Sequence, residues 1–183
     1  MLGKENKKAL FGSSFKIIAI IFVLINLFLL SGCYSKEKKY LDIIRKQAEL
    51  YAVDPYLVLA VCRAESNFKV DAKSNRGAIG IMQLMPSTAS WLAEEKLLLS
   101  YTESMLVNAE FNIKLGSYYL SYLSRIFQDT DWAIVAYNAG EGIALKWKSL
   151  GISKSSIPYY ETQNYLYKVK KWIRKYQYLQ LFN

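Results

Sequence analysis

Glu65 is the residue of this sequence best suited to acid–base chemistry. It follows a run at 55–64 in which Arg63 is the one charged residue and the others are apolar or nearly apolar. On a helix, the residues one and two turns before it on its own face are all apolar: Leu57, Val58, Val61 and Cys62. A carboxyl group on such a face is partly desolvated, and desolvation favours the neutral acid. We therefore expect the pKa of Glu65 to be raised.

A carboxylic acid that stays protonated near neutral pH is what a glycosidase needs to protonate the oxygen of its leaving group. Arg63 lies two positions from Glu65 and points elsewhere on the helix, so it is a poor partner for the carboxylate. From this segment alone a second interpretation stays open, in which Glu65 ends a helix and caps a loop or pairs with a distant lysine.

The stretch from Ser74 to Gln83 is rich in small and polar residues, and it follows Glu65 closely. Gly77 and Gly80 permit tight turns, so this part of the chain is predicted to be a loop. Ser74 can be a simple turn former here. Any sheet in the protein would be a small hairpin within residues 69–82.

The remaining elements are predicted to be helices, because no run alternates at period two over more than a few residues. Residues 40–51 show apolar spacings of three and four. Asp54 and Pro55 have the types expected for an N-cap and a first helical turn, and the helix after them is apolar nearly all round, so we expect it to be central. Further helices are expected at residues 86–95 and 108–127, on either side of Gly140 and Gly142, and after Pro158. The fold class is therefore mainly α.

Two of these helices carry stripes to which we assign no chemistry. On the helix at 108–127 the stripe is predicted to face the core, and it consists of Phe111, Leu115, Tyr118, Tyr122 and Ile126. The last helix carries an apolar face (Val169, Trp172, Ile173 and Tyr176) and a basic one. The basic residues are most simply solvated, and contact with an anionic wall or membrane is the alternative: Lys168, Lys170, Lys171, Arg174 and Lys175.

Composition narrows the chemistry further. The chain has no His and no Cys-x-x-Cys, so the usual zinc sites are unavailable, and any chemistry must come from carboxylates, hydroxyls, amides and aromatic side chains. Without residues 1–32, 20 Lys and Arg and 14 Asp and Glu remain, a net charge of +6. That excess favours an anionic partner, although a solvated basic surface explains it equally well. We expect no nucleic-acid partner, because no such motif is present.

The N-terminal segment has the three parts of a secretory signal: lysines, an apolar run at 17–30, and Leu-Ser-Gly before Cys33. The run holds 14 residues, and a membrane-spanning helix needs about 20. The ending resembles a bacterial lipoprotein signal, which implies that Cys33 is lipidated, with palmitate, and becomes the first mature residue. The alternative is an uncleaved membrane helix. Cys62 is then left without a partner and is expected to be a small buried hydrophobe.

Four separated motifs resemble the catalytic domain of the soluble lytic transglycosylases, a lysozyme-like family related to goose-type lysozyme. They cover residues 40–175 in the family's order: Glu65-Ser66, "GAIGIMQLMPSTA" at 77–89, "AYNAG" at 136–140 and "IPYYETQNYLYKV" at 157–169. Two departures, Ile81 where leucine is commoner and Glu141 where proline is frequent, affect no reacting group. Together with the resemblance to a lipoprotein signal, this implies a signal peptide at 1–32, a lipidated tether at 33–39 and a catalytic domain at 40–183.

The same resemblance implies roles for individual residues. Glu65 would be the single catalytic acid and would serve first as acid and then as base, so that the resemblance implies neither a metal nor a cofactor. Ser74 would help to orient an acetamido group of the sugar. The full set of substrate-binding residues implied is Ser66, Ser74, Gln83, Met85, Tyr137, Asn138, Glu161 and Tyr165.

The implied reaction is cleavage of the β-1,4 bond between N-acetylmuramic acid and N-acetylglucosamine in peptidoglycan, with formation of a 1,6-anhydromuramic acid end. Two alternatives stay open: a muramidase of similar fold, in which water attacks, and a non-catalytic wall-binding lipoprotein. An acid on an apolar helix face argues against the binding module, which has no need of one. We expect a monomer in the bacterial cell envelope, in contact with glycan strands and anchored to the membrane through Cys33.

Overall fold

The computed structural model describes residues 20–21 and 35–182 of the chain. The chain divides into two units, Met1–Lys39 and Tyr40–Asn183. In the first unit the structure describes a short helix, α2 (Ser35–Lys38). Cys33 and the predicted signal peptide, except for Ile20 and Ile21, lie outside the described residues. Among the residues that are described, no helix is both long enough and apolar enough to cross a membrane.

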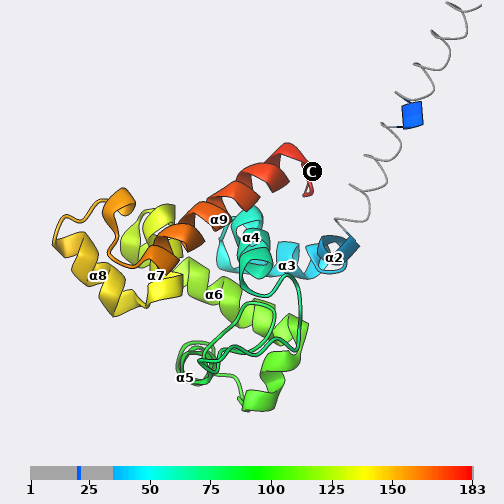
Figure 1. The fold of residues 1–183 in the computed structure, drawn as a ribbon. Coiled ribbons are helices and arrows are strands. Elements are labelled where there is room, and N and C mark those ends of the chain that lie inside the picture. The colour runs from blue at the N-terminus through cyan, green and yellow to red at the C-terminus, as the bar shows by residue number, and fades with distance from the viewer. Residues whose placement is uncertain (1–19, 22–34, 183) are drawn as a thin grey trace, which may run out of the picture. The chain divides into compact units, whose positions relative to one another are not determined.

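The second unit is built from helices (Figure 1), and the described residues contain no strand. Its long helices are α3 (Leu41–Tyr51), α4 (Pro55–Glu65), α6 (Ala109–Phe127), α7 (Thr130–Ala139), α8 (Glu141–Ser149) and α9 (Tyr160–Tyr178). The short ones are α5 (Pro86–Ser90), a π-helical turn at Trp91–Lys96, and 3₁₀ turns at Glu103–Val107 and Lys154–Ser156. The mainly α prediction is confirmed. The predicted hairpin region forms only isolated bridges, Lys73 with Ile79 and Ile79 with Leu84.

Helix α4 is the centre of the second unit. Asp54 caps its first turn by accepting a hydrogen bond from the Tyr56 N–H at 2.8 Å, and Pro55 occupies the first helical position, where its missing N–H costs nothing. Every residue from Leu57 to Cys62 is buried, as the unbroken apolar sequence predicts. Helices α3, α6 and α9 pack around α4, and Figure 1 shows α9 running alongside it. Cys62 is buried and free, as expected.

The buried face of α6 differs from the predicted stripe. Leu115 is fully buried, but Phe111, Tyr118 and Tyr122 are only partly buried and Ile126 is exposed. The face that is buried instead includes Asn112, Ile113, Gly116, Leu120 and Leu123. The reason is that α6 packs against both α3 and α7, so the core covers a wider arc of this helix than one apolar stripe indicates.

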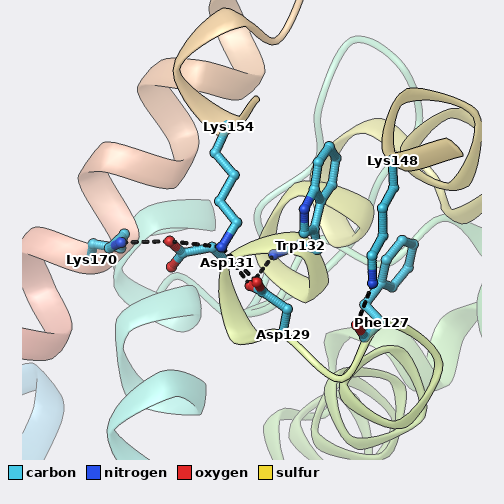
Figure 2. Close-up of polar contacts among 7 residues, drawn as sticks. All are labelled: Phe127, Asp129, Asp131, Trp132, Lys148, Lys154 and Lys170. Atoms are coloured by element: carbon cyan, nitrogen blue, oxygen red, sulfur yellow. Dashed lines mark hydrogen bonds and ion pairs between the residues drawn. The ribbon is translucent and has the colours of Figure 1, made fainter. Parts of the chain in front are cut away.

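A cluster of charged side chains fixes the turn between α6 and α7 (Figure 2). Asp129 caps α7 through the Trp132 N–H at 3.1 Å, and Lys154 Nζ donates to both oxygens of Asp129 at 2.8 and 2.6 Å. Asp131 lies 3.5 Å from Lys154 Nζ and 2.6 Å from Lys170 Nζ. Burial opposes the charge on Asp129, but the hydrogen bonds from Lys154 and the Trp132 N–H lower its pKa. These contacts join the start of α7 to α9. The two helices carry four of the predicted site residues: Tyr137, Asn138, Glu161 and Tyr165.

Candidate active site

A cavity of about 380 Å³ lies where the end of α4, the loop after it, the end of α7 and the start of α9 meet. Seven residues predicted to act in catalysis or substrate binding line it: Glu65, Ser74, Gln83, Met85, Tyr137, Asn138 and Glu161. Asn75, Arg76 and Ala78 complete the lining. The two other predicted residues, Ser66 and Tyr165, are buried and do not line the cavity.

Glu65 is the last residue of α4 and is partly buried. Desolvation raises the pKa of its carboxyl group, and the negative charge of Glu161 acts in the same direction. Tyr165 and the positive charge of Lys168 oppose this, and the resulting pKa is about 7, against an ordinary value of 4.5. The dominant cause is the one expected from the helix face. A substantial fraction of the molecules therefore carries a proton on Glu65 at neutral pH.

Two tyrosines lie close to Glu65: Tyr137 is partly buried and Tyr165 is buried. The Tyr137 hydroxyl donates to the carbonyl oxygen of Met82 at 2.9 Å. The Tyr165 hydroxyl is near enough to Glu65 to favour its carboxylate, yet within the described part of the chain it has no hydrogen-bond partner of normal length. Burial and the Glu65 charge raise the pKa of both tyrosines well above its usual range, so both stay neutral and can donate a proton in a hydrogen bond.

The predicted loop supplies the polar wall of the cavity. Ser74 Oγ accepts a hydrogen bond from the Ala78 N–H at 3.0 Å, which closes the turn. Gln83 has a positive φ of 50°, and its Nε2 donates to the carbonyl oxygens of Ala72 (3.0 Å) and Gly80 (2.9 Å). Ser66 fixes the loop from behind, because its hydroxyl donates to the Ile81 carbonyl oxygen at 2.7 Å.

Asn112 on α6 holds the same loop, and sequence reasoning missed it. Its Nδ2 donates to the carbonyl oxygens of Ile79 and Leu106, both at 3.0 Å, and its Oδ1 accepts from the Met82 N–H at 2.9 Å. It is completely buried. Asn112 lies outside the apolar stripe predicted for this helix, so the local pattern carried no signal for its role, although a buried amide of this kind is expected to be hydrogen-bonded.

The α7 and α9 side of the cavity is held by polar contacts. Thr162 Oγ1 donates to Asn138 Oδ1 at 2.8 Å, which joins the two helices beside the cavity. Glu161 Oε2 lies 3.5 Å from Arg76 Nη2 on the loop, so this ion pair joins opposite walls. Met85 is exposed. The described residues contain no cluster of three His, Cys, Asp or Glu side chains that could hold a metal ion.

Lys168 does more than was expected of it. It is exposed, as predicted for the basic face, and its Nζ also donates to the Ala64 carbonyl oxygen at 2.6 Å, while its positive charge lowers the pKa of Glu65. Arg63 does point away from Glu65, because its guanidinium lies over the Trp172 ring at 4.5 Å. The cation that acts on the acid therefore comes from α9 and not from α4.

Residues 42–158 match the family model described as the transglycosylase SLT domain, which is well over half of the chain. The chain belongs to this SLT family. Among similar proteins, it is 29% identical over 148 residues to the soluble lytic murein transglycosylase of Escherichia coli K12, covering 76% of this chain and 23% of that one. It is 35% identical over 122 residues to the membrane-bound lytic murein transglycosylase C of Edwardsiella ictaluri, covering 61% and 34%. The chain thus spans between a fifth and about a third of the length of these relatives.

Solved structures of SLT proteins share the fold. The 70 kDa soluble lytic transglycosylase of Escherichia coli is similar with a TM-score of 0.72 and 30% identity, over 78% of this chain and 24% of that one. The lytic transglycosylase Slt of Pseudomonas aeruginosa, in an inactive Glu-to-Gln mutant, gives a TM-score of 0.70 at 30% identity, over 75% and 24%. The predicted lysozyme-like transglycosylase fold is therefore confirmed.

Proposed function

We propose that this protein is a peptidoglycan lytic transglycosylase with Glu65 as its catalytic acid and base. The observation that carries the proposal is a partly buried carboxyl group with a pKa of about 7, lining a cavity in a chain of the SLT family. The substrate is the β-1,4 bond between N-acetylmuramic acid and N-acetylglucosamine, which agrees with the names of the murein-cleaving relatives.

In the first step, protonated Glu65 donates its proton to the glycosidic oxygen while the bond from that oxygen to C1 breaks. The acetamido carbonyl of the substrate stabilises the positive charge at C1, and Ser74 helps to orient that group. Gln83, Met85, Tyr137 and Asn138 contact the saccharide. Their common position around the same cavity as Glu65 supports these roles.

In the second step, Glu65 acts as a carboxylate and accepts the proton of the muramic acid C6 hydroxyl. The C6 oxygen bonds to C1 and closes the 1,6-anhydro ring, so Glu65 ends the cycle protonated. A pKa of about 7 suits both roles, because both the protonated and the ionised carboxyl group are readily populated at neutral pH. An intramolecular hydroxyl competes well with water because its effective concentration is very high. Behind the cavity wall, Ser66 holds the loop through the Ile81 carbonyl oxygen, and Tyr165 lies beside the Glu65 carboxyl group.

Mass spectrometry of purified peptidoglycan digested with the protein tests the reaction directly. The expected products carry 1,6-anhydromuramic acid ends, and E65Q is expected to release less than about a hundredth as much, since a general acid contributes roughly 10²–10⁴-fold. Circular dichroism would confirm that the variant is folded. Reducing ends without anhydro ends would identify a muramidase and overturn the lyase assignment, and near-normal activity of E65Q would refute the role of Glu65.

We further propose that the protein is a lipoprotein of the bacterial cell envelope. Residues 1–32 would be the signal peptide, Cys33 the lipidated residue, 33–39 the tether and 40–183 the catalytic domain. The support is the sequence "LSGC" after an apolar run. A relative named as membrane-bound also agrees with an anchored enzyme.

A further inference from the structure

The side of α9 that faces away from the core carries exposed tyrosines together with basic residues. Tyr167, Lys171, Arg174 and Tyr178 follow one another at spacings of four, three and four, so they lie on one side of the helix. Tyr167 is 64% exposed and Tyr178 is 88% exposed, and the two basic side chains are exposed as well. The opposite side of α9 is packed against α4 and α7. We call these four residues the outer face of α9.

The outer face is positively charged. Within the part of the chain that the structure describes, the side chains of Lys171 and Arg174 form no ion pair and no hydrogen bond. α9 contains a single acidic residue, Glu161, in its first turn. At roughly 1.5 Å per residue, Glu161 lies about 15 Å along the helix axis from Lys171, too far to neutralise it. Both cations are therefore available to a negatively charged partner.

A cavity of about 500 Å³ adjoins the outer face, and Tyr167 and Arg174 are part of its lining. Lys154 and Lys170 line it too, but both are paired with Asp131, which Figure 2 shows between them. Arg174 is therefore the cation of this cavity that has no carboxylate partner among the described residues. Its planar guanidinium presents a fork of donors that matches the oxygens of a phosphate group.

Exposed tyrosines beside lysine and arginine suit the boundary between a membrane and water. A tyrosine ring enters the layer between headgroups and acyl chains while its hydroxyl stays hydrated. Basic side chains bind the phosphates of anionic lipids. A soluble anionic polymer offers partners for the charges but no apolar layer for the two rings. The combination therefore fits a lipid surface better than an anionic wall polymer.

We propose that the outer face of α9 contacts an anionic membrane surface, and that Arg174 holds the phosphate of a lipid headgroup in the adjoining cavity. The contact would leave the proposed active site open, because no residue of the outer face lines the cavity that contains Glu65. The membrane would then hold the domain in an orientation that keeps this cavity accessible to glycan strands.

This inference rests on the proposed lipid anchor, since the outer face alone binds weakly. One basic residue near an anionic surface strengthens binding roughly fivefold, so Lys171 and Arg174 together supply only about thirtyfold. Residues 33–39 span at most about 25 Å even when fully extended. A lipid at Cys33 would therefore keep the domain close to the membrane at a high effective concentration, at which a weak contact is populated.

Hydroxyl-radical footprinting tests the contact without altering the outer face, because mass spectrometry measures the oxidation of each tyrosine. The protein is purified with its lipid anchor and reconstituted into vesicles of phosphatidylcholine, with or without phosphatidylglycerol. We expect Tyr167 and Tyr178 to be protected on the anionic vesicles and oxidised on the neutral ones. Met85 is the reference, since it is 40% exposed and lines the Glu65 cavity, and it should be oxidised equally on both.

Equal oxidation of the two tyrosines on both kinds of vesicle would overturn the proposal. Equal protection of Met85 and the tyrosines would also overturn it, because the protection would then not belong to α9. Protection of the tyrosines by soluble teichoic acid, but not by vesicles, would assign the outer face to the wall and overturn the membrane contact.

The double variant K171Q/R174Q is compared with a matched control, K46Q/K146Q, which removes two positive charges from exposed positions on α3 and α8. K171Q/R174Q is expected to lower the ratio of bound to free domains about thirtyfold and so restore oxidation of the tyrosines. The control should keep the protection. Equal loss in both double variants would show that net charge and not the outer face is responsible, which would overturn the proposal.

The anchor, the reaction and this contact fail separately. A protein without the lipid would leave the vesicles on flotation, and its footprint is then recorded with the same vesicles in excess. Cleavage of soluble glycan strands needs no membrane, and K171Q/R174Q should cleave them at the native rate. A native protein that cleaves no strands would refute the proposed reaction, while the oxidation of Tyr167 and Tyr178 would still decide the membrane contact.

Discussion

At the scale of single residues, the proposed chemistry depends on how Glu65 is kept protonated. Burial of its carboxyl group raises the pKa, and the Glu161 charge adds to this, while Tyr165 and Lys168 limit the rise. The acid is therefore tuned by residues of two helices, α4 and α9. Arg76 enters the same balance indirectly, because it pairs with Glu161.

The rate of cleavage is expected to follow the protonated fraction of Glu65. Above a pKa of about 7, kcat/KM should fall roughly tenfold per pH unit, because that parameter reports the ionisation of the free enzyme. K168M removes a positive charge that lowers this pKa, so it should move the alkaline limb to higher pH. K168R keeps the charge and serves as the control. An alkaline limb that is identical in native protein and K168M would contradict the assignment of Lys168.

Ionisation of the same carboxyl group is expected to destabilise the folded protein. Because its pKa is raised in the folded state, this destabilisation is absent below the unfolded pKa of 4.5 and grows with pH until the pH exceeds about 7. E65Q carries no charge at any pH, and should therefore exceed the native protein in free energy of unfolding by about 3 kcal/mol at alkaline pH and by much less in acid. Urea unfolding near pH 5 and pH 8 measures this difference. A difference in free energy of unfolding that does not grow with pH would show that ionisation of Glu65 does not destabilise the folded protein.

The raised pKa of Glu65 was predictable from the sequence because apolar residues precede it on its own helix face. Leu57, Val58, Val61 and Cys62 precede it on one face, and all four are buried. Lys168 and Arg76 were not predictable as partners of the site. Their positions depend on how α9 docks against α4 and how the loop folds back, and neither has a signature in the local pattern.

At the scale of elements, the loop after α4 is the part that needs most support, because it has no strand or helix of its own between Glu65 and Pro86. Asn112 holds it through three hydrogen bonds. Gly80 makes this contact possible, since it has a φ of +88° and its Cα lies against Asn112 and Leu106. Gly116 on α6 similarly leaves room for the Met82 side chain.

G80A is expected to destabilise the protein by roughly 2–5 kcal/mol, because strain and overpacking add. A Cβ there would lie 2.2 Å from Asn112 Nδ2 and 2.3 Å from the Leu106 carbonyl oxygen. G142A is the control, since Gly142 lies in α8 with nothing within 4 Å of its Cβ position, and should gain up to about 1 kcal/mol. Thermal unfolding of both variants measures the two changes in stability. Equal changes for G80A and G142A would refute the packing argument.

The helices were predicted to within a few residues where caps and apolar spacing mark them, as at Asp54 and Pro55. The 3₁₀ turn at Glu103–Val107 was not anticipated, because it is too short to have a period. The buried face of α6 was misjudged because a helix between two neighbours buries residues outside its apolar stripe. Asn112, the residue that holds the loop, lies on that misjudged face.

At the scale of the whole molecule, the proposed anchor and the catalytic domain make separate predictions. C33S is expected to move the protein from the membrane fraction to the soluble fraction, because a lipid chain at residue 33 would be the attachment. Fractionation with antibody detection measures this, and the specific activity of the released protein should be unchanged. If C33S stays in the membrane fraction, residues 17–30 form a permanent span instead.

The docking of α9 on α4 also has a consequence for the time at which activity begins during synthesis. A ribosome makes Glu65 long before Tyr165 and Lys168, so until α9 docks on α4 the carboxyl group lacks the two α9 groups that lower its pKa. An unfinished or proteolytically shortened chain would also lack Glu161, and with it one wall of the cavity. The proposed wall-degrading activity is therefore expected to begin only when the last helix is in place.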